Sequence, residues 1–233
     1  PVPGIRVSVV MPAFNEERSI EQVVNEFLHE HVFEIIVVDN QSTDRTGELA
    51  ARSGARVIRV TGTTYPYGYP CILGLKAARG DVIVLVESDH TYRAFDMKKL
   101  LVYLENADMV LGTRTTPQLL DRGSQLDWFL FWGNYFISKL IQIRFWGQIR
   151  LTDVGCTYRA IRAEARDIII DDLRVYREHF SPEMIIVALK KNLRIIEVPV
   201  TFSPRIGESK GAGEGRKKAI VIGLRMLWLV LTR

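Results

Sequence analysis

Two carboxylates stand one residue apart after an apolar run. Glu87 and Asp89 follow the segment 82–86, which reads VIVLV. A short apolar run rich in β-branched residues is typical of a buried parallel strand. Side chains alternate along an extended chain, so both carboxylates are expected on the same side. Such a pair suits Mg²⁺ or Mn²⁺, although an isolated pair of acids is more often only a solvated strand end.

Two earlier segments, 5–11 and 34–39, have the β-branched content of strands and also end in polar residues. Proline cannot donate to a ladder, so Pro12 is expected to end the first strand. The carboxyl ends of parallel strands lie at one edge of a sheet, where α/β proteins bind ligands. With the acidic pair, the polar residues expected at this edge are Asn15, Glu16, Asp39 and Asn40.

Strand and helix patterns alternate along the first half of the chain, which predicts an α/β fold with a doubly wound, mostly parallel sheet and flanking helices. No G-x-G-x-x-G follows the first strand and no G-x-x-x-x-G-K-[ST] is present, which argues against a dinucleotide oxidoreductase and a P-loop protein. The expected strands are 5–11, 34–39, 55–60, 82–87, 108–112 and 193–201, and the expected helices include 20–28, 71–78, 95–104 and 182–191.

Composition describes an ordinary globular chain. Its 233 residues are 47% hydrophobic and 25% charged, which allows one large domain or two small ones. Cys71 and Cys156 make no disulfide framework, and no secretory signal is recognisable, so a cytoplasmic location is expected. The formal net charge of +4 is mild, and no nucleic-acid partner is predicted.

The segment 125–146 is expected to be a helix that is apolar nearly all round. Two interpretations stay open: a helix that covers the sheet, or a helix at a lipid headgroup boundary, where Trp and Tyr gather. Lys139 and Arg144 argue against a membrane span. Its narrow polar stripe consists of Asn134, Ser138 and Gln142.

The chain ends in a second apolar segment, 219–231, which is expected to be an amphipathic helix. As a helix it would reach ~20 Å, against a hydrocarbon core of ~30 Å, so it is too short to cross a bilayer. Arg216, Lys217 and Lys218 precede it and would be attracted to anionic headgroups. Residues 211–233 are therefore predicted to be a basic and apolar tail at a membrane surface.

Six motifs, in this order along the chain, resemble the family-2 glycosyltransferases with the GT-A fold. The resemblance is greatest to the dolichol-phosphate mannose synthase branch, which transfers a sugar from a nucleotide to a polyprenyl phosphate. The motifs are PAFNE at 12–16, VDNQSTD at 38–44, ESD at 87–89, GTR at 112–114, TDVGCTYR at 152–159 and PRIGESK at 204–210.

The resemblance implies a GT-A domain over 1–210, with a nucleotide-binding half at 1–112 and an acceptor-side half at 113–210. Its donor would be a GDP- or UDP-linked sugar, its acceptor a polyprenyl phosphate such as dolichyl phosphate, and its products would have inverted stereochemistry. Mg²⁺ or Mn²⁺ would be bound by Glu87 and Asp89. The remaining implied roles are catalysis by Asp89, Arg114, Arg205 and Lys210, and donor binding by Pro12, Ala13, Asn15, Glu16, Asp39, Asn40, Ser42 and Ser88.

The sequence departs from the branch at two places. Glu87 replaces the usual first Asp, and His90-Thr91 stands where the mannose synthases usually have Leu-Gln, whose Gln is a metal ligand.

Other functions remain open. The same fold could act on a saccharide hydroxyl, with His90, Asp153 or His179 as the candidate base. A nucleotide-sugar-binding protein without turnover and a nucleotidyltransferase are the alternatives of other classes. A phosphate acceptor is already anionic near neutral pH and needs no strong base. The expected site of action is the cytoplasmic face of a membrane.

Overall fold

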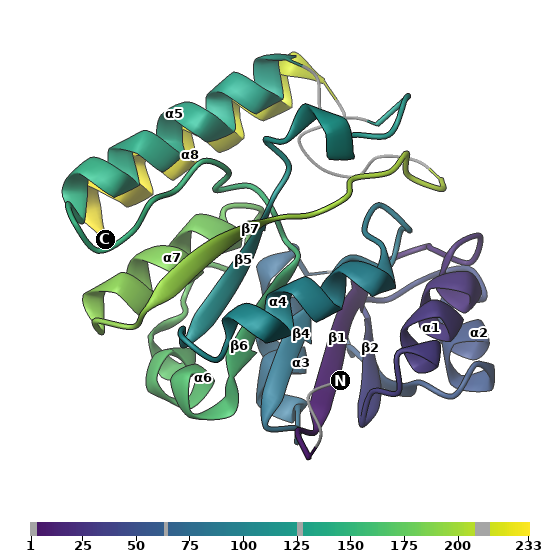
Figure 1. Ribbon diagram of the computed structural model, residues 1–233. Coiled ribbons are helices and arrows are strands. Elements are labelled where there is room, and N and C mark those ends of the chain that lie inside the picture. Colours follow the sequence, from purple (N-terminus) through teal and green to yellow (C-terminus); the bar gives the residue numbers. More distant parts are fainter. Residues whose placement is uncertain (1–3, 63–64, 125–127, 208–214) are drawn as a thin grey trace.

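A seven-stranded sheet runs through the centre of the computed structural model, which describes residues 4–62, 65–124, 128–207 and 215–233 (Figure 1). The strand order is β3-β2-β1-β4-β6-β5-β7, and β6 is antiparallel to both of its neighbours while the other pairs are parallel. The predicted doubly wound, mostly parallel sheet is confirmed. The strands are β1 Val7–Ala13, β2 Glu34–Asp39, β3 Arg56–Arg59, β4 Val82–Leu85, β5 Met109–Thr113, β6 Arg159–Arg162 and β7 Ile195–Pro199.

Helices cover both faces of the sheet, and a separate apolar core lies on each face. Helices α1, α2 and α4 pack on one face, and α3, α6 and α7 pack on the other, because alternate strand residues turn apolar side chains to opposite sides. The helices are α1 Ile20–His29, α2 Thr46–Arg52, α3 Gly68–Ala77, α4 Met97–Tyr103, α5 Trp128–Arg144, α6 Ala163–Ile169, α7 Phe180–Lys190 and α8 Arg216–Thr232. Short 3₁₀ turns occupy Ala94–Asp96, Pro117–Leu119 and Ile170–Asp172.

The expectation that Pro12 ends the first strand is wrong, because β1 continues through Ala13 with Pro12 opposite Val38 of β2. The ladder between β1 and β4 ends earlier, at Val10 and Leu85. Beyond that point no strand residue of β4 requires an N–H donor from β1, so the missing N–H of Pro12 is tolerated. The Pro12 carbonyl accepts a hydrogen bond from Ser88 Oγ at 2.9 Å.

The neighbours of β1 bring the predicted strand ends together. β2 and β3 lie on one side of β1, whereas β4 lies on its other side, so the chain reverses its direction across the sheet at β1 and β4. Such a switch point opens a crevice beyond the carboxyl ends of the strands. The loops after β1, β2 and β4 therefore meet at one edge.

Helix α5 turns its polar stripe inward. Ser138 is fully buried, and its Oγ accepts a hydrogen bond from the Val154 N–H at 2.8 Å. Gln142 Oε1 accepts hydrogen bonds from the Leu151 N–H at 3.2 Å and from Lys139 Nζ at 3.0 Å. The stripe thus anchors the loop that follows the helix. Ile137 and Ile141 join the core beside it, and other large apolar side chains face outward. The exposed ones on and just after α5 are Trp128, Trp132, Phe136, Ile143 and Trp146.

Helix α8 lies beside α5 on the same side of the molecule (Figure 1). Its inner side chains join the core, and the Arg144 guanidinium at the end of α5 donates to the Val230 carbonyl. The described part of the expected tail is thus packed on the domain. No described helix is both long and apolar enough to cross a membrane. The buried α8 side chains are Ile222, Met226, Leu229 and Val230, and the exposed apolar ones are Ile220, Val221, Leu224, Trp228 and Leu231.

A stability prediction follows from the contact between α3 and the sheet. A Cβ at Gly74 would overlap with the Val10 side chain and lie 3.1 Å from Val38 Cγ2. We expect Gly74→Ala to lower the free energy of unfolding by about 1–3 kcal/mol, measured by urea denaturation, because a packed core resists added volume. Gly223→Ala is the matched control: that helical glycine has open space around it, so alanine should raise stability by about 0.5–1 kcal/mol. Equal effects of the two changes would contradict the packing argument.

Candidate active site

The acidic residues after β1 and β4 converge on one arginine. The Arg205 guanidinium pairs with Glu16 Oε1, and its Nη1 lies 3.1 Å from Asp89 Oδ2. All three side chains are largely buried, with 14% of Arg205 and 6% of each carboxylate exposed. The structure therefore brings together three predicted site residues from segments far apart in the sequence.

Both carboxylate oxygens of Asp89 have partners in the structure. Its Oδ1 accepts hydrogen bonds from the Thr91 N–H at 3.0 Å and from Thr91 Oγ1 at 2.6 Å, while Oδ2 faces Arg205. Glu87 is half-buried beside it. Burial, and then the charge of Asp89, raise the pKa of Glu87 above its ordinary value, although Tyr67 and Arg205 oppose this rise. Two neighbouring carboxylates of this kind are the environment that a divalent cation would stabilise.

Glu87 and Asp89 supply the hard oxygen donors that Mg²⁺ or Mn²⁺ prefers. One buried polar atom at the same place, Arg205 Nε, has no hydrogen-bond partner among the described residues. An orphaned guanidinium nitrogen beside two carboxylates fits a site that is completed by phosphate oxygens. No described group of three or more His, Cys, Asp or Glu side chains forms a metal site from protein ligands alone.

His90 points away from the acidic pair. Its backbone is left-handed, with φ of 67°, and its Nε2 lies 3.0 Å from Glu26 Oε1 on α1. Thr91 occupies the position of the family's ligand Gln, and its hydroxyl bonds to Asp89. His90 is therefore a partner of α1 in this structure.

The loops after β1 and β2 are joined by the residues expected to bind the nucleotide. The Asn15 N–H donates to Ser42 Oγ at 3.0 Å, and Asn15 Oδ1 accepts from the Thr43 N–H at 2.7 Å. Asp39 is fully buried and accepts a hydrogen bond from the Ser42 N–H at 2.9 Å. Gly47 allows this approach, since a Cβ there would lie 2.7 Å from Asp39 Oδ2.

The other predicted donor-binding residues lie at the same edge. The Asn40 side chain exchanges two hydrogen bonds with the backbone of Tyr65. Ala13 is the last residue of β1, and Ser88 bonds to Pro12 as described above. The structure therefore groups all the predicted donor-binding residues, and their role toward a nucleotide remains a prediction.

Arg114 forms a buried ion pair. Its Nε and Nη2 lie 2.7 and 2.9 Å from the two Asp153 oxygens, and its guanidinium stacks over the Phe202 ring. Burial alone would raise the pKa of Asp153, but the charge and hydrogen bonds of Arg114 hold it below its ordinary value. Arg114 thus fastens the loop after α5 to the end of β5, and the catalytic role implied for it remains a prediction. Lys210 lies outside the described residues.

One residue of the site was not anticipated. Arg59 Nε lies 3.3 Å from Asp39 Oδ2 and places a second cation at the predicted nucleotide edge. These two residues are opposite each other in the β2–β3 register. The sequence places Asp39 and Arg59 at or next to the end of a predicted strand segment, but it does not give the register that places them opposite each other.

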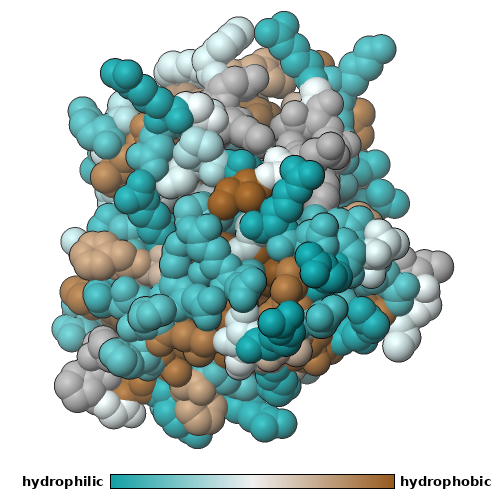
Figure 2. Space-filling view, turned by 90° about the vertical axis from the view of Figure 1, so that its right-hand side faces the viewer, coloured by the Kyte–Doolittle hydropathy of each residue, from teal (hydrophilic) through white to brown (hydrophobic). Residues whose placement is uncertain are grey.

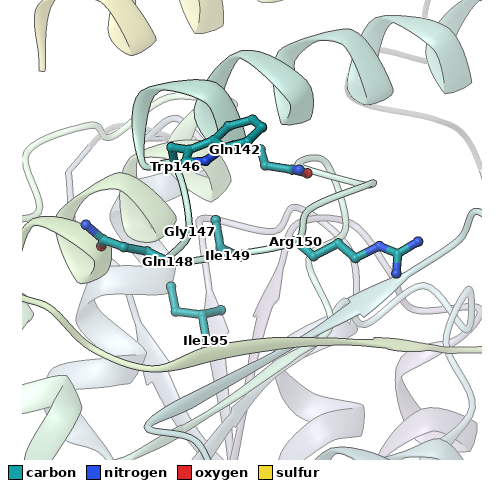
Figure 3. A pocket seen from close by; sticks show the side chains of 7 residues that line it. All are labelled: Gln142, Trp146, Gly147, Gln148, Ile149, Arg150 and Ile195. Atoms are coloured by element: carbon teal, nitrogen blue, oxygen red, sulfur yellow. The ribbon is translucent and has the colours of Figure 1, made fainter.

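A separate cavity of about 440 Å³ lies under the end of α5 (Figure 3). Its walls come from the end of α5, the loop that follows and Ile195 at the start of β7. None of the predicted site residues lines it. The acidic residues follow the carboxyl ends of parallel strands, whereas this cavity adjoins an amino-terminal end.

The fold and the acidic edge define an α/β protein that binds its ligand at the switch point of the sheet. A sequence profile described as "Glycosyl transferase family 2" matches residues 8–168, and the chain belongs to this family. Its fold is therefore GT-A, as the motifs imply.

Named relatives agree with this assignment. The chain is 35% identical over 209 residues to the low-salt glycan biosynthesis hexosyltransferase Agl6 of Haloferax volcanii, covering 87% of this chain and 49% of that protein. It thus spans about half the length of that relative. It is 30% identical to the undecaprenyl-phosphate mannosyltransferase of Micrococcus luteus, covering 93% of this chain and 92% of that one.

A solved structure of glucosyl-3-phosphoglycerate synthase from Mycobacterium tuberculosis, in complex with Mn²⁺, UDP and glucosyl-3-phosphoglycerate, superposes with a TM-score of 0.70. It is 21% identical and covers 96% of this chain and 78% of that one, so the likeness concerns the fold. The chain is a glycosyltransferase, and its donor and acceptor require a separate argument.

The Arg114–Asp153 pair yields a stability prediction. Asp153→Asn should lower the free energy of unfolding at pH 7 by about 3 kcal/mol, because it leaves a buried guanidinium without its counter-charge. A depressed folded-state pKa stabilises the protein fully above the ordinary Asp pKa of about 3.9, and this contribution is lost as the pH falls through the folded value. The difference between wild type and variant in urea denaturation should therefore shrink in acid.

Asp121→Asn is the control, because Asp121 pairs with Arg93 at the surface. We expect it to change stability by less than about 1 kcal/mol. A cost at Asp153 no greater than this would show that the buried pair does not stabilise the domain.

Proposed function

We propose that this protein is a metal-dependent, inverting glycosyltransferase that moves a sugar from a nucleoside-diphosphate sugar to a polyprenyl phosphate at a membrane surface. The observation that carries the proposal is the grouping of Glu16, Glu87 and Asp89 with Arg205 at the switch point. Carboxylates for a cation and a guanidinium for phosphate are the groups that a diphosphate donor requires.

Glu87 and Asp89 would hold the divalent ion. When bound, Mg²⁺ or Mn²⁺ supplies positive charge that stabilises the diphosphate as it leaves. Arg205 can add a second positive charge in a site from which water is largely excluded. The exposed Arg59 guanidinium, which pairs with buried Asp39, offers hydrogen-bond donors at the ends of β2 and β3, where the base of the donor would lie.

The surroundings of the candidate bases support a phosphate acceptor. Asp153 is held by Arg114, and His90 is paired with Glu26. His179 lies beside α8, where burial and then Arg225 lower its pKa. A hydroxyl acceptor would need one of these groups to take a proton at the acidic edge. A phosphate acceptor is already an anion and can attack without a base.

The exposed side chains of α5 and α8 support a lipid-linked acceptor. The two neighbouring helices expose nine large apolar residues, including Trp128, Trp132 and Trp228 at 69%, 56% and 69%. The molecular face that Figure 2 presents is mainly hydrophilic, with smaller separate hydrophobic areas. Apolar surface of this extent marks an interaction site, and a tryptophan-rich one suits a headgroup boundary.

The charges beside these helices fit the same partner. Arg216 and Lys217 lie in the first turn of α8 and are exposed. Cations at that place would be drawn to anionic headgroups at about 1 kcal/mol each. In the sequence, α8 begins at Arg216, 11 residues after Arg205. A lipid phosphate and the active-site guanidinium could then lie at similar depth, on what we propose is the cytoplasmic face.

A product assay tests the chemistry. The protein should transfer sugar from one member of a panel of GDP- and UDP-sugars to a short polyprenyl phosphate in the presence of Mn²⁺, and chelation should stop the reaction. Asp89→Asn should lower turnover by about 100-fold or more and remove the metal dependence of donor binding in calorimetry, because it removes the charge that holds the ion.

Release of pyrophosphate would identify a nucleotidyltransferase instead, and donor binding without product from any acceptor would identify a binding protein. Unchanged metal-dependent donor affinity in Asp89→Asn would contradict the metal assignment. If the protein glycosylates a free saccharide and not the polyprenyl phosphate, its acceptor is a hydroxyl group.

A flotation experiment tests the surface. The protein should float with vesicles that contain phosphatidylglycerol, and less so at high salt. Replacing Leu224 and Trp228 by serine should reduce the bound fraction several-fold, because both contribute exposed apolar area. Ile168→Ser is the control, since that residue is half exposed on α6, away from α5 and α8. An intact chain that stays unbound at low salt would remove the membrane argument.

A further inference from the structure

Arg205 bonds to carboxylates from two different loops. One end of its guanidinium meets Glu16, after β1, and the other meets Asp89, after β4. Only 14% of the side chain is exposed. A charge that is removed from water in this way is stable only with close counter-charges, and here two carboxylates supply them. The guanidinium therefore holds the two loops together by electrostatic attraction.

The backbone around Arg205 keeps the guanidinium at this place. The Ile206 N–H donates to the Asp89 carbonyl at 3.1 Å, and the Ser203 N–H donates to the Thr91 carbonyl at 2.9 Å. Gly207 follows with φ of +102°, a conformation that favours glycine. Residues 203–207 thus lie along residues 89–91, and we refer to residues 203–207 as the strap.

A bound metal ion and Arg205 would both interact with Asp89 Oδ2. Asp89 Oδ1 is already bonded to Thr91, so Oδ2 is the Asp89 oxygen left for a metal ion, and Oδ2 faces Arg205. A divalent ion close to Oδ2 would be repelled by the guanidinium as long as Arg205 remains there. Metal and arginine are therefore competitors for one carboxylate.

Arg205 has a hydrogen-bond donor that is not used by its carboxylate partners. Its Nε is buried without a hydrogen-bond partner among the described residues. A guanidinium presents its donors as a planar fork that matches two oxygens of one phosphate. The carboxylate contacts use the two terminal nitrogens toward different residues, so a phosphate could satisfy the fork more completely.

We propose that Arg205 is an internal counter-ion that occupies the cation position of the acidic edge until a divalent ion and the donor diphosphate replace it. Arg205 then pairs with phosphate, and its former place beside Asp89 passes to the metal ion. This proposal rests on the proposed function, because it assumes a metal-bound diphosphate. It assigns Arg205 a role before catalysis: the arginine weakens metal binding to the empty enzyme and links metal binding to donor binding.

Manganese binding without any nucleotide tests the competition. In the intact chain, free Mn²⁺ can be followed by electron paramagnetic resonance. Arg205→Gln should bind Mn²⁺ about tenfold more tightly than wild type, because the competing charge is gone, while its turnover falls. Arg205→Lys keeps the charge and should stay closer to wild type. Arg194→Gln is the matched control, since Arg194 pairs with Asp108 beside the start of β5 and should leave Mn²⁺ affinity unchanged.

Arginine labelling of the wild-type protein provides a second measurement that needs no variant. Phenylglyoxal should modify Arg205 slowly in the metal-free protein, and Mn²⁺ alone should speed the modification several-fold, as detected by mass spectrometry. Manganese affinity in Arg205→Gln that is equal to or weaker than wild type would overturn the proposal. So would unchanged labelling with Mn²⁺ bound. A different result would separate the two proposals. If Arg205→Gln binds Mn²⁺ more tightly but the wild-type protein transfers no sugar to a lipid, the competition between Arg205 and the metal ion stands and the proposed function is rejected.

Discussion

Like charges that converge at the switch point are the constraint on which this site depends. β1 and β4 are parallel neighbours, so Glu16 and Asp89, which follow the carboxyl ends of these strands, both reach Arg205. Glu87 adds a third acidic side chain. Such a group is unfavourable in a partly buried place unless a cation joins it. In this structure Arg205 provides the cation, and the strap on which it lies is bonded to the backbone beside Asp89.

The loop after α5 is held by inward-facing polar groups of that helix. Ser138 and Gln142 of α5 fasten the loop 151–155, and that loop presents Asp153 to Arg114 at the end of β5. Ile137 and Ile141 of α5 are buried beside the polar stripe, and the large side chains on the other faces of the helix are left on the surface. The buried face of α5 therefore carries both polar and apolar groups, and its exposed apolar face connects the packing of the domain with its proposed contact with lipid.

The family assignment agrees with the position of the acidic loops. The profile match covers residues 8–168, which include both acidic loops, and the relatives include a polyprenyl-phosphate mannosyltransferase. Arg59 beside Asp39 adds a cation where the motifs of the family had indicated only polar groups. The ends of β2 and β3 therefore carry one negative and one positive side chain, and a Cβ at Gly47 would collide with Asp39.

Much of this protein was determined by the sequence alone. Alternating apolar segments specified a parallel α/β sheet, and acids at the strand ends located the site, because strand direction and side-chain period are local properties. The placement of β6 between β4 and β5, the pairing of Arg205 with Glu16 and Asp89, and the inward turn of the α5 stripe were decided only by tertiary structure. Each depends on which distant segments become neighbours: a helix that is apolar nearly all round does not indicate which face turns inward, and a loop arginine does not indicate which carboxylate it meets.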